Sequence, residues 1–525
     1  MQKSSLYQKH LHKELEKLIR EALESVGIAD GEFVVEHPTD LKMGDYSTNA
    51  GIKTGKAKEI LAYLETKFPS ELGRVELAGP GFINFYLSKE FFRKSLEEII
   101  DKGEDFGKGE HAKGFKVMVE HTDPNPFKEF HIGHLMPNVI GSTIARICEW
   151  NGAEVKQVNY QGDVGLHVAK ALWKGDYVLG SRAYDEDPQA KIEIQEINRK
   201  IYEKSDSELN KRYEKGKKES LKKFEEIYKR LGTKFDYYFF ESETGNIGKK
   251  IVLDNLGKVF EKSEGAIVFK GSHTRVFINS LGLPTYEAKD LGNAKNKFDK
   301  YPYDLSVVVT GNEIKDYFKV VLEAMSKVIP ELAKKTKHLP HGMLRLPSGK
   351  MSSRTGDVIT AEELIEEVKG RVKGDEQVAI GAIKYMILRQ AIGNDIVFDF
   401  EKSVSTEGDS GVYLQYAHAR ANSIMEKACS KPTWTRRVQV GETREVERLL
   451  YRFPEMVERA GMEYAPNYIT TYLTELAASF NNFYAHEQVL GDSPESGYRL
   501  AIVEAFKNVM KNGLDILGIP APERM

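Results

Sequence analysis

The hydrophobic pattern between residues 115 and 159 changes twice, from strand to helix and back. An apolar run at 115–119 is typical of a buried strand, and a second run follows at 155–158. Between them, apolar residues recur at helical spacing; they are Leu135, Val139, Ile140, Ile144, Ile147 and Cys148. Asn151-Gly152 ends this helix, because glycine tolerates the left-handed conformation found after helix C-termini. The order of strand, loop, helix and strand predicts a βαβ unit of a parallel sheet.

The same α/β character returns between residues 265 and 360. Runs at 265–269 and 275–278 predict strands, and 317–328 predicts a helix. The stretch 305–311 is almost continuously apolar, which is typical of a parallel strand buried on both faces. We therefore expect this region to complete the sheet that begins near residue 115.

The segments around these two regions have different patterns. Residues 1–105 combine amphipathic helices with short alternating strands, which predicts a separate α+β domain. Residues 371–525 carry long apolar stripes at helical spacing, which predicts an all-α bundle. Residues 106–370 then form the parallel-sheet domain, interrupted at about 185–245 by a strongly charged helical insertion whose charges we interpret as a solvated face.

Composition limits the class of protein. A chain of 525 residues is too long for one core, which indicates three or more domains. Lys and Arg total 76 against 79 Asp and Glu, so a uniformly basic nucleic-acid coat is excluded. Two cysteines argue against a disulfide framework, and the sequence has no apolar run long enough for a membrane span. Since the N-terminus also lacks a signal-peptide pattern, we expect a cytoplasmic protein without a membrane partner.

The first candidate site is the loop that enters the predicted helix, His131-Ile132-Gly133-His134. Ligands of parallel sheets bind at the carboxyl ends of strands, against helix N-termini. Two imidazoles in the first helical turn can face an anion, and Gly133 lets a ring or phosphate approach the backbone. This arrangement suits a nucleotide triphosphate attacked at its α-phosphorus, with positioning and charge stabilisation as the protein's contribution. The alternative is that the two histidines only cap the helix or fill a gap.

The second candidate site is the loop at 347–356, which is rich in hydroxyls and cations. Its Lys350 and Arg354 can neutralise a polyphosphate, and its amides and hydroxyls can donate hydrogen bonds. On its own it could equally be an ordinary surface loop. The chain has no GxxxxGK[ST] motif, which argues against a Walker-type nucleotide hydrolase.

Together the two loops resemble the class I aminoacyl-tRNA synthetases, which carry a His-Ile-Gly-His loop and a Lys-Met-Ser-Lys-Ser loop on a Rossmann-type sheet. Further motifs resemble the arginyl-tRNA synthetases over essentially the whole chain. These are Glu120 with Asp123-Pro124-Asn125 and Lys128, the stretches 159–163, 285–290 and 413–420, the N-terminal 79–84, and the ending 517–525. The C-terminal bundle would then bind the anticodon, and the N-terminal domain would contact tRNA.

The resemblance implies a set of site residues. For catalysis and ATP binding these are His131, Gly133, His134, Lys128, Met343, Lys350, Met351 and Ser352; for arginine, Glu120, Asn125, Tyr286 and Asp290; and for tRNA, Tyr416, Arg420 and Met525. A guanidinium needs anionic acceptors, which Glu120 and Asp290 would supply. The substrates would be ATP with Mg²⁺, L-arginine and tRNA(Arg), with no metal held by the protein itself and a monomeric chain.

The chain also departs from the family pattern. Ser353 stands where a second lysine is typical, and we expect Lys128 to supply that charge. Met136 and Ile314 replace polar residues of the family. A helix tolerates proline only in its first turn, so we expect Pro137 to lie in the first turn of the helix after the histidine loop. Two alternatives therefore stay open. One is a tRNA-binding relative with weakened or lost activation, and the other is a class I synthetase for another amino acid.

Overall fold

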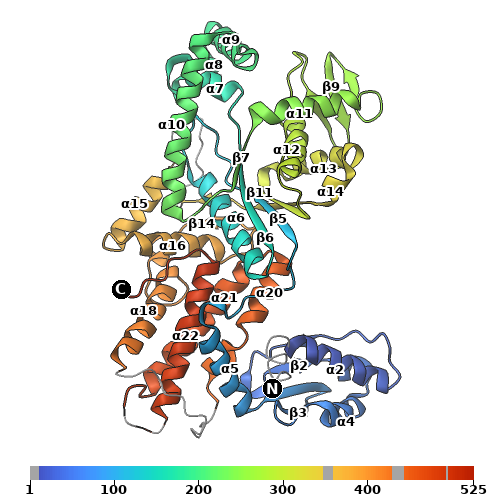
Figure 1. Ribbon diagram of the computed structural model, residues 1–525, viewed down its shortest axis with the longest axis vertical. Helices are drawn as coiled ribbons and strands as arrows, with labels where there is room; N and C mark the ends of the chain where they lie inside the picture. The colour runs from blue at the N-terminus through green and yellow to red at the C-terminus, as the bar shows by residue number, and fades with distance from the viewer. Residues whose placement is uncertain (1–10, 347–358, 429–442, 492, 494) are drawn as a thin grey trace.

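The computed structural model describes residues 11–346, 359–428, 443–491, 493 and 495–525. Its centre is a five-stranded sheet in the order β12-β11-β5-β6-β7, in which every neighbouring pair is parallel. The strands are β5 (Lys116–Glu120), β6 (Glu154–Gln161), β7 (Tyr237–Phe240), β11 (Leu305–Gly311) and β12 (Thr336–His341). The parallel sheet predicted from the two apolar regions is thereby confirmed (Figure 1).

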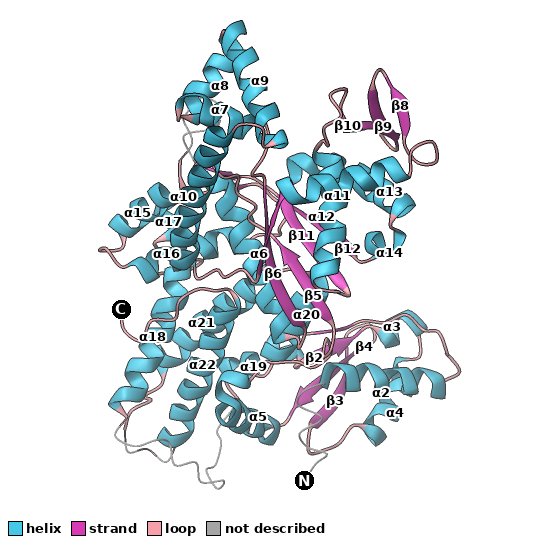
Figure 2. Cartoon of the chain, turned by 45° about the horizontal axis from the view of Figure 1, so that its top comes forward, coloured by secondary structure: helices cyan, strands magenta, loops and turns pink. Residues whose placement is uncertain are grey.

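Helices cover both faces of this sheet. Alternate residues of β5 point to opposite sides: Val117 and Val119 pack with α6 (Ile132–Trp150), and Met118 packs with Tyr303 on the other side. That second side carries α11 (Glu241–Asp254), α12 (Tyr286–Lys300), α13 (Lys315–Val328) and α14 (Pro330–Lys334). Beyond them lies a small antiparallel sheet of β8 (Glu261–Ser263), β9 (Ala266–Lys270) and β10 (Thr274–Ile278). Figure 2 shows the central strands between these two helical layers.

The charged insertion begins and ends earlier than the predicted bounds of about 185–245, because residues 237–240 form a strand of the central sheet and 241–254 form a helix that covers it. Four helices lie between β6 and β7: α7 (Leu166–Lys174), α8 (Tyr177–Glu186), α9 (Pro188–Glu203) and α10 (Ser207–Leu231). They have a small core of their own, which includes Val168, Ile194 and Leu209. The charge pattern did not indicate α7 as part of the insertion, because that helix is largely apolar and begins soon after β6. The chain then returns to the sheet through β7.

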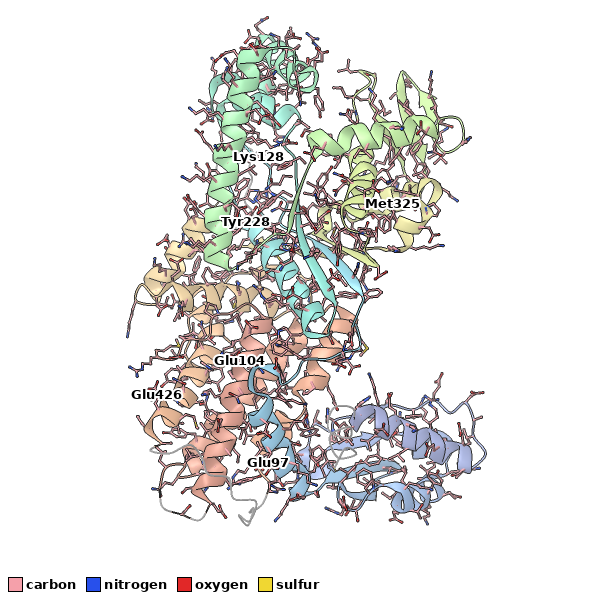
Figure 3. The ribbon with its side chains drawn as sticks, viewed as in Figure 1. Glu97, Glu104, Lys128, Tyr228, Met325 and Glu426 are labelled. Atoms are coloured by element: carbon pink, nitrogen blue, oxygen red, sulfur yellow. The ribbon has the colours of Figure 1, made fainter. Side chains whose placement is uncertain are left out.

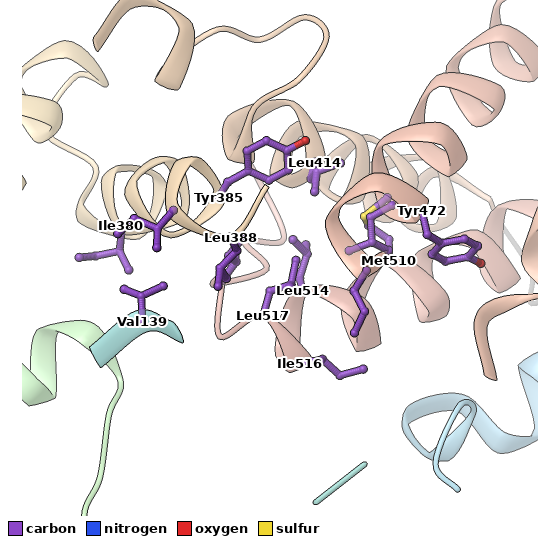
Figure 4. Packing of buried hydrophobic residues seen from close by; sticks show 14 of the residues in the cluster. Val139, Ile380, Tyr385, Leu388, Leu414, Tyr472, Met510, Leu514, Ile516 and Leu517 are labelled. Atoms are coloured by element: carbon purple, nitrogen blue, oxygen red, sulfur yellow. The ribbon is translucent and has the colours of Figure 1, made fainter. Parts of the chain in front are cut away.

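The C-terminal part is helical, as predicted. Its elements are the short parallel pair β13 (Leu344–Arg345) and β14 (Ile396–Val397), with α15 (Ala361–Arg371), α16 (Glu376–Leu388), α17 (Phe400–Ser403), α18 (Gly411–Lys427), α19 (Glu445–Leu450), α20 (Phe453–Glu463), α21 (Asn467–His486) and α22 (Ser496–Ile516). One apolar core continues from α6 into this bundle. Figure 4 shows Val139 of α6 next to Ile380 and Leu388 of α16, with Leu514 and Leu517 beyond. The bundle is therefore joined to the sheet by packing and not only by a linker.

A buried lysine strengthens this junction. Lys384 of α16 is 1% exposed, and its ammonium donates to the carbonyls of Leu231 (2.7 Å) and Gly518 (2.6 Å). Burial, with Arg146 nearby, holds the pKa of Lys384 well below its usual value. One side chain thus connects the end of α10, the bundle and the C-terminal tail.

The N-terminal domain has its own core beside the bundle. Its elements are α2 (Leu11–Ser25), β1 (Val35–Glu36), η1 (Leu41–Met43), β2 (Tyr46–Thr48), α3 (Ala50–Thr54), α4 (Ala57–Lys67), β3 (Gly73–Ala78), β4 (Phe82–Leu87), α5 (Lys89–Lys102) and η2 (Gly103–Asp105). The sheet has the order β1-β2-β4-β3 and is antiparallel. Polar pairs fix the domain against the bundle: Asp45 binds Arg448 (2.6 Å), and His37 meets Glu455 (2.9 Å).

Candidate functional site

The two histidines predicted as a phosphate site form the N-terminal cap of α6. His131 is the N-cap residue, and its Nδ1 accepts a hydrogen bond from the amide of Gly133 (3.0 Å). The Nδ1 of His134, in turn, accepts from the amide of His131 (3.3 Å). This reciprocal arrangement is a capping box built from two imidazoles. Because each Nδ1 accepts a backbone N–H, each ring carries its proton on Nε2 and can donate through Nε2–H.

Both histidines are uncharged at neutral pH. Burial, with the cation of Lys128 nearby, lowers the pKa of His131 to about 4. Burial, the neighbouring ring and Lys128 hold the pKa of His134 well below its usual value. The rings are stacked with centroids 3.9 Å apart. They therefore offer an anion two neutral N–H donors, while positive charge comes from Lys128 and the helix N-terminus.

Lys128 lies close enough to act on this pair. Its ammonium sits over the ring of Tyr177 (5.0 Å), and its charge also lowers the pKa of His167, which burial lowers first. A cavity of about 630 Å³ opens beside it, between the 127–130 loop and α10. Figure 3 shows Lys128 near the upper part of α10, with Tyr228 further along the same helix.

The start of α6 also explains Gly133 and Pro137. A Cβ on Gly133 would lie 2.7 Å from the His131 ring, so only glycine fits the capping box. Pro137 was expected in the first helical turn, but it is the sixth residue of α6 and lies in the second. Its missing N–H falls opposite the carbonyl of Gly133, which is exposed at the sheet edge. The helix therefore loses a hydrogen bond only at its open end, and the expectation was wrong by one turn.

The chain returns to this helix just after the second predicted loop. The amide of Ile132 donates to the carbonyl of Ile359 (3.2 Å), and the amide of Ala361 donates to the carbonyl of Phe130 (2.9 Å). The predicted loop residues Lys350, Met351, Ser352 and Ser353 lie outside the described residues. The described segment that follows them is nevertheless bonded directly to the histidine loop.

A cluster of acidic side chains, called the acidic pocket below, lies at the same edge of the sheet: Glu120, Asp123 and Asp290 are close enough for their charges to shift one another's pKa. Glu120 ends β5, the middle strand, and is 5% exposed. Its Oε2 accepts from the ammonium of Lys297 (2.7 Å) and from the Nδ2 of Asn293 (2.9 Å). Although burial opposes a charge on Lys297, Glu120 beside it raises the pKa of Lys297 above its usual value. Glu120 is thus held as one half of a buried ion pair.

Asp290 and Tyr286 come to the pocket from α12. The Oδ2 of Asp290 accepts from the hydroxyl of Tyr317 (2.5 Å). Burial raises the pKa of Asp290 to about 8, with Glu120 and Glu241 adding to the shift and the Tyr317 hydrogen bond opposing it. Tyr286 is 60% exposed at the outer end of the helix. Because its surroundings disfavour a negative charge, Asp290 ionises most readily when a cationic ligand pairs with it.

The loop after Glu120 brings two more polar residues to the pocket. Asp123 accepts from the amide of Tyr160 (2.7 Å), and burial next to Glu120 raises its pKa well above its usual value. Thr122 and Asp123 both have positive φ (81° and 44°), a strained conformation for residues with side chains. The Oδ1 of Asn125 lies against Gly162, where a Cβ would come within 2.3 Å of it. The loop is therefore held in one shape around the pocket.

Other predicted residues lie elsewhere on the edge or in the bundle. The N–H and C=O of Met343 are bonded to Asp395 and Ile396, so a contact with ATP would use its side chain. Ile314 closes the short η3 helix (Asn312–Ile314) and offers no polar group.

Tyr416 and Arg420 lie together on α18, with the guanidinium 4.7 Å above the tyrosine ring. The C-terminal tail runs along the same helix, since the carbonyl of Pro520 accepts from Gln415 (2.8 Å) and His418 meets the carbonyl of Pro522 (3.0 Å). Met525 ends this tail and is 50% exposed. The structure thus brings the three predicted tRNA residues to one region, away from the sheet edge.

Sequence reasoning missed several residues of the pocket: Asp123 as a carboxyl beside Glu120, Asn293, Lys297 and Tyr317. Asn293 and Lys297 follow Tyr286 and Asp290 at helical spacing, so the stripe could have indicated them. Tyr317 comes from α13, and no local pattern points to it. Among the described residues, no group of three or more His, Cys, Asp or Glu side chains is arranged to hold a metal, and no helix has the length and apolarity of a membrane span.

Three family models match the chain. The arginyl-tRNA synthetase N-terminal domain matches residues 13–87, the class I (R) tRNA synthetase catalytic domain matches 96–243, and the DALR anticodon-binding domain matches 414–525. The arginine–tRNA ligase of Treponema denticola is 30% identical, covering 97% of this chain and 99% of its own. That of Thermococcus sibiricus is 29% identical, covering 97% and 98%. Among solved structures, Thermus thermophilus arginyl-tRNA synthetase has a TM-score of 0.80 at 26% identity, covering 98% of this chain and all of its own.

The catalytic-domain match and the parallel sheet with its histidine-capped helix define a class I aminoacyl-tRNA synthetase. The similarity to arginine–tRNA ligases extends over nearly the full length of both chains. The chain belongs to the arginyl-tRNA synthetase family.

Proposed function

We propose that this protein ligates L-arginine to tRNA(Arg) at the expense of ATP. The observation that carries the proposal is the pocket at the carboxyl edge of the sheet. There Glu120 is buried at the end of β5, Asp290 of α12 lies near enough to raise its own pKa through the Glu120 charge, and the loop that follows Glu120 leads into the histidine-capped start of α6. An acidic pocket next to a site for polyphosphate suits the joining of a cationic amino acid to a nucleotide.

The first step is attack of the arginine carboxylate on the α-phosphate of ATP, which forms arginyl-adenylate and releases pyrophosphate. In this step the protein positions the reactants and stabilises charge. The Nε2–H groups of His131 and His134 would donate to phosphate oxygens, with Lys128 and Lys350 neutralising the β and γ phosphates. In the second step the terminal adenosine hydroxyl of the tRNA attacks the arginyl carbonyl of the adenylate, which forms the ester and releases AMP.

The arginine pocket favours a guanidinium by charge and by shape. Planar N–H groups match carboxylate oxygens in pairs, which a compact ammonium cannot do. Asn125 would hold the main-chain groups of the substrate, and Tyr286 would cover its side chain from the rim. An acidic substrate would meet like charges, so glutamate is disfavoured.

The tRNA would span the molecule from the sheet edge to the bundle. Aromatic faces and cations bind single-stranded RNA loops, and Tyr416 and Arg420 supply them on α18. Met525, exposed at the end of the tail, would add an apolar contact. Mg²⁺ would enter bound to ATP, held mostly by phosphates and water, so the protein needs no resident metal ligands. We also propose that the chain acts as a monomer in the cytoplasm.

Aminoacylation of tRNA with labelled arginine, in the presence of ATP and Mg²⁺, tests the proposal. Arginine should be charged selectively over lysine, glutamate and glutamine. Binding of tRNA without any charging would instead favour the non-catalytic relative, and selective charging of another amino acid would favour a different specificity.

A further inference from the structure

One face of α12 carries four polar side chains of the acidic pocket. Tyr286, Asp290, Asn293 and Lys297 are spaced by four, three and four residues, which places them on a single stripe of the helix. Exposure falls along the stripe, from 60% at Tyr286 to 3% at Asn293 and 2% at Lys297. The lower half of this stripe consists of two fully buried polar residues. Burial of a polar group costs free energy unless the group forms hydrogen bonds or ion pairs.

Lys297 accounts for its own burial. Its ammonium pairs with Glu120 (2.7 Å) and donates to the hydroxyl of Ser306 (3.1 Å). It therefore fixes the Glu120 side chain at the floor of the pocket. Glu120 accepts both of its hydrogen bonds on Oε2 in the part of the chain that the structure describes.

Asn293 is satisfied on one side only. Its Nδ2 donates to Glu120 (2.9 Å), and since a carboxylate accepts, the amide must turn its NH₂ group to Glu120 and its carbonyl oxygen away. That Oδ1 is buried and has no hydrogen-bond partner among the described residues. An unused buried acceptor costs free energy on the order of 1–3 kcal/mol, so a residue that carries one beside a ligand pocket is best explained by the ligand.

We propose that Asn293 is a specificity-determining residue for arginine, and that its Oδ1 accepts one N–H of the substrate guanidinium between Glu120 and Asp290. This inference rests on the proposed arginine ligase function. A guanidinium carries five N–H donors in a fixed plane, more than two carboxylates use. The third acceptor therefore adds selectivity over lysine, whose ammonium has three donors at a single point.

The test uses two variants that remove the acceptor. Asn293→Ala shortens the side chain, and Asn293→Leu keeps much of its volume, so the result does not depend on how one variant folds. Asn296→Ala is the matched control, because Asn296 is half-buried on the same helix and lies off the stripe. The readouts are kcat and KM for arginine, ATP and tRNA in aminoacylation, and the inhibition constant of agmatine, which carries the guanidinium without the carboxylate.

Both variants should raise the KM for arginine by about 10- to 100-fold, as for loss of one hydrogen bond to a charged group, with kcat and the KM for ATP within about threefold. The inhibition constant of agmatine should rise by the same factor as the KM for arginine, and Asn296→Ala should match the wild type. An unchanged KM for arginine, or equal losses for arginine, ATP and tRNA, would overturn the inference. If the wild-type protein charges no arginine, the proposed function is wrong. If the wild type charges arginine and the Asn293 variants keep its KM, only the inference about Asn293 is wrong.

Discussion

The amide of Ile132 donates a hydrogen bond to the carbonyl of Ile359, 3.2 Å away. Ile132 lies between the two histidines of the α6 cap, and Ile359 directly follows the loop that contains Lys350. The exit of that loop is therefore fixed to the histidine site, although the two are far apart in sequence. This contact is the physical basis for expecting Lys350 to act on the same triphosphate as His131 and His134.

Replacement of Lys350 by alanine should lower kcat for arginylation by about 100-fold and leave the KM for arginine within about threefold. The reason is that the variant lacks the positive charge that would stabilise the departing pyrophosphate. Lys128→Ala should give a loss of the same kind, whereas Lys128→Arg should retain most of the activity. Steady-state aminoacylation measures both. Lys334→Ala, an exposed lysine of α14, serves as the control. Full activity of Lys128→Ala would show that this residue does not supply the charge that Ser353 lacks.

The histidines should act as neutral donors. His134→Gln, which can still place an N–H near the position of Nε2, should keep more activity than His134→Ala, for which we expect a loss of about 100- to 1,000-fold in kcat. Since the pKa of His131 is about 4, its imidazole should not change charge between pH 6 and 7. The pH profile of the rate in this range should therefore be the same in the wild type and in His131→Asn, apart from its height. Pyrophosphate exchange with tRNA present, followed across this pH range, measures the effect. A step in the wild-type profile that the variant lacks would mean that a charged imidazole is required.

Arginine binding should depend on the ionisation of Asp290. Its pKa is about 8 in the free protein, so at pH 7 the carboxyl is mostly protonated and must release its proton to bind a guanidinium. The KM for arginine should therefore fall about fivefold between pH 7 and pH 8 and level off above pH 9. Tyr317→Phe removes the hydrogen bond that lowers this pKa, so the fall should move to higher pH. A KM that is flat across this range in both proteins would contradict the assignment.

The sequence predicted the sheet and the histidine loop well, and the pocket only in part. Val117, Val119 and the apolar stripe of α6 follow periods that any parallel βαβ unit imposes. Glu120 and Asp290 were predicted from a family motif, but their hydrogen-bond and ion-pair partners were not. Lysines usually lie at the surface, and Lys297 is a buried counterion only because α12 packs against the end of β5. Tyr317 reaches Asp290 from a third element, a contact that depends on tertiary packing and leaves no local signal.

Stability should decrease as the pH falls below neutrality. His121 is fully buried, and burial lowers its pKa to about 3, so between about pH 3 and 6.5 the unfolded chain binds a proton that the folded chain does not. The free energy of unfolding therefore rises with pH in this window, by about 2 kcal/mol for His121 between pH 5 and 7. Urea unfolding of His121→Gln at both pH values should show a smaller difference than the wild type. His486→Gln, at an exposed position, should behave like the wild type. Equal pH dependence in all three proteins would contradict the prediction.

The most direct measurement is aminoacylation by the purified protein with ATP, Mg²⁺ and tRNA, comparing labelled arginine, lysine, glutamate and glutamine, each with a control that omits tRNA. The account predicts that arginine alone is attached to tRNA, and that Asp290→Ala abolishes the selectivity or the activity. Charging of a different amino acid, or tRNA binding with no charging of any of the four, would contradict it.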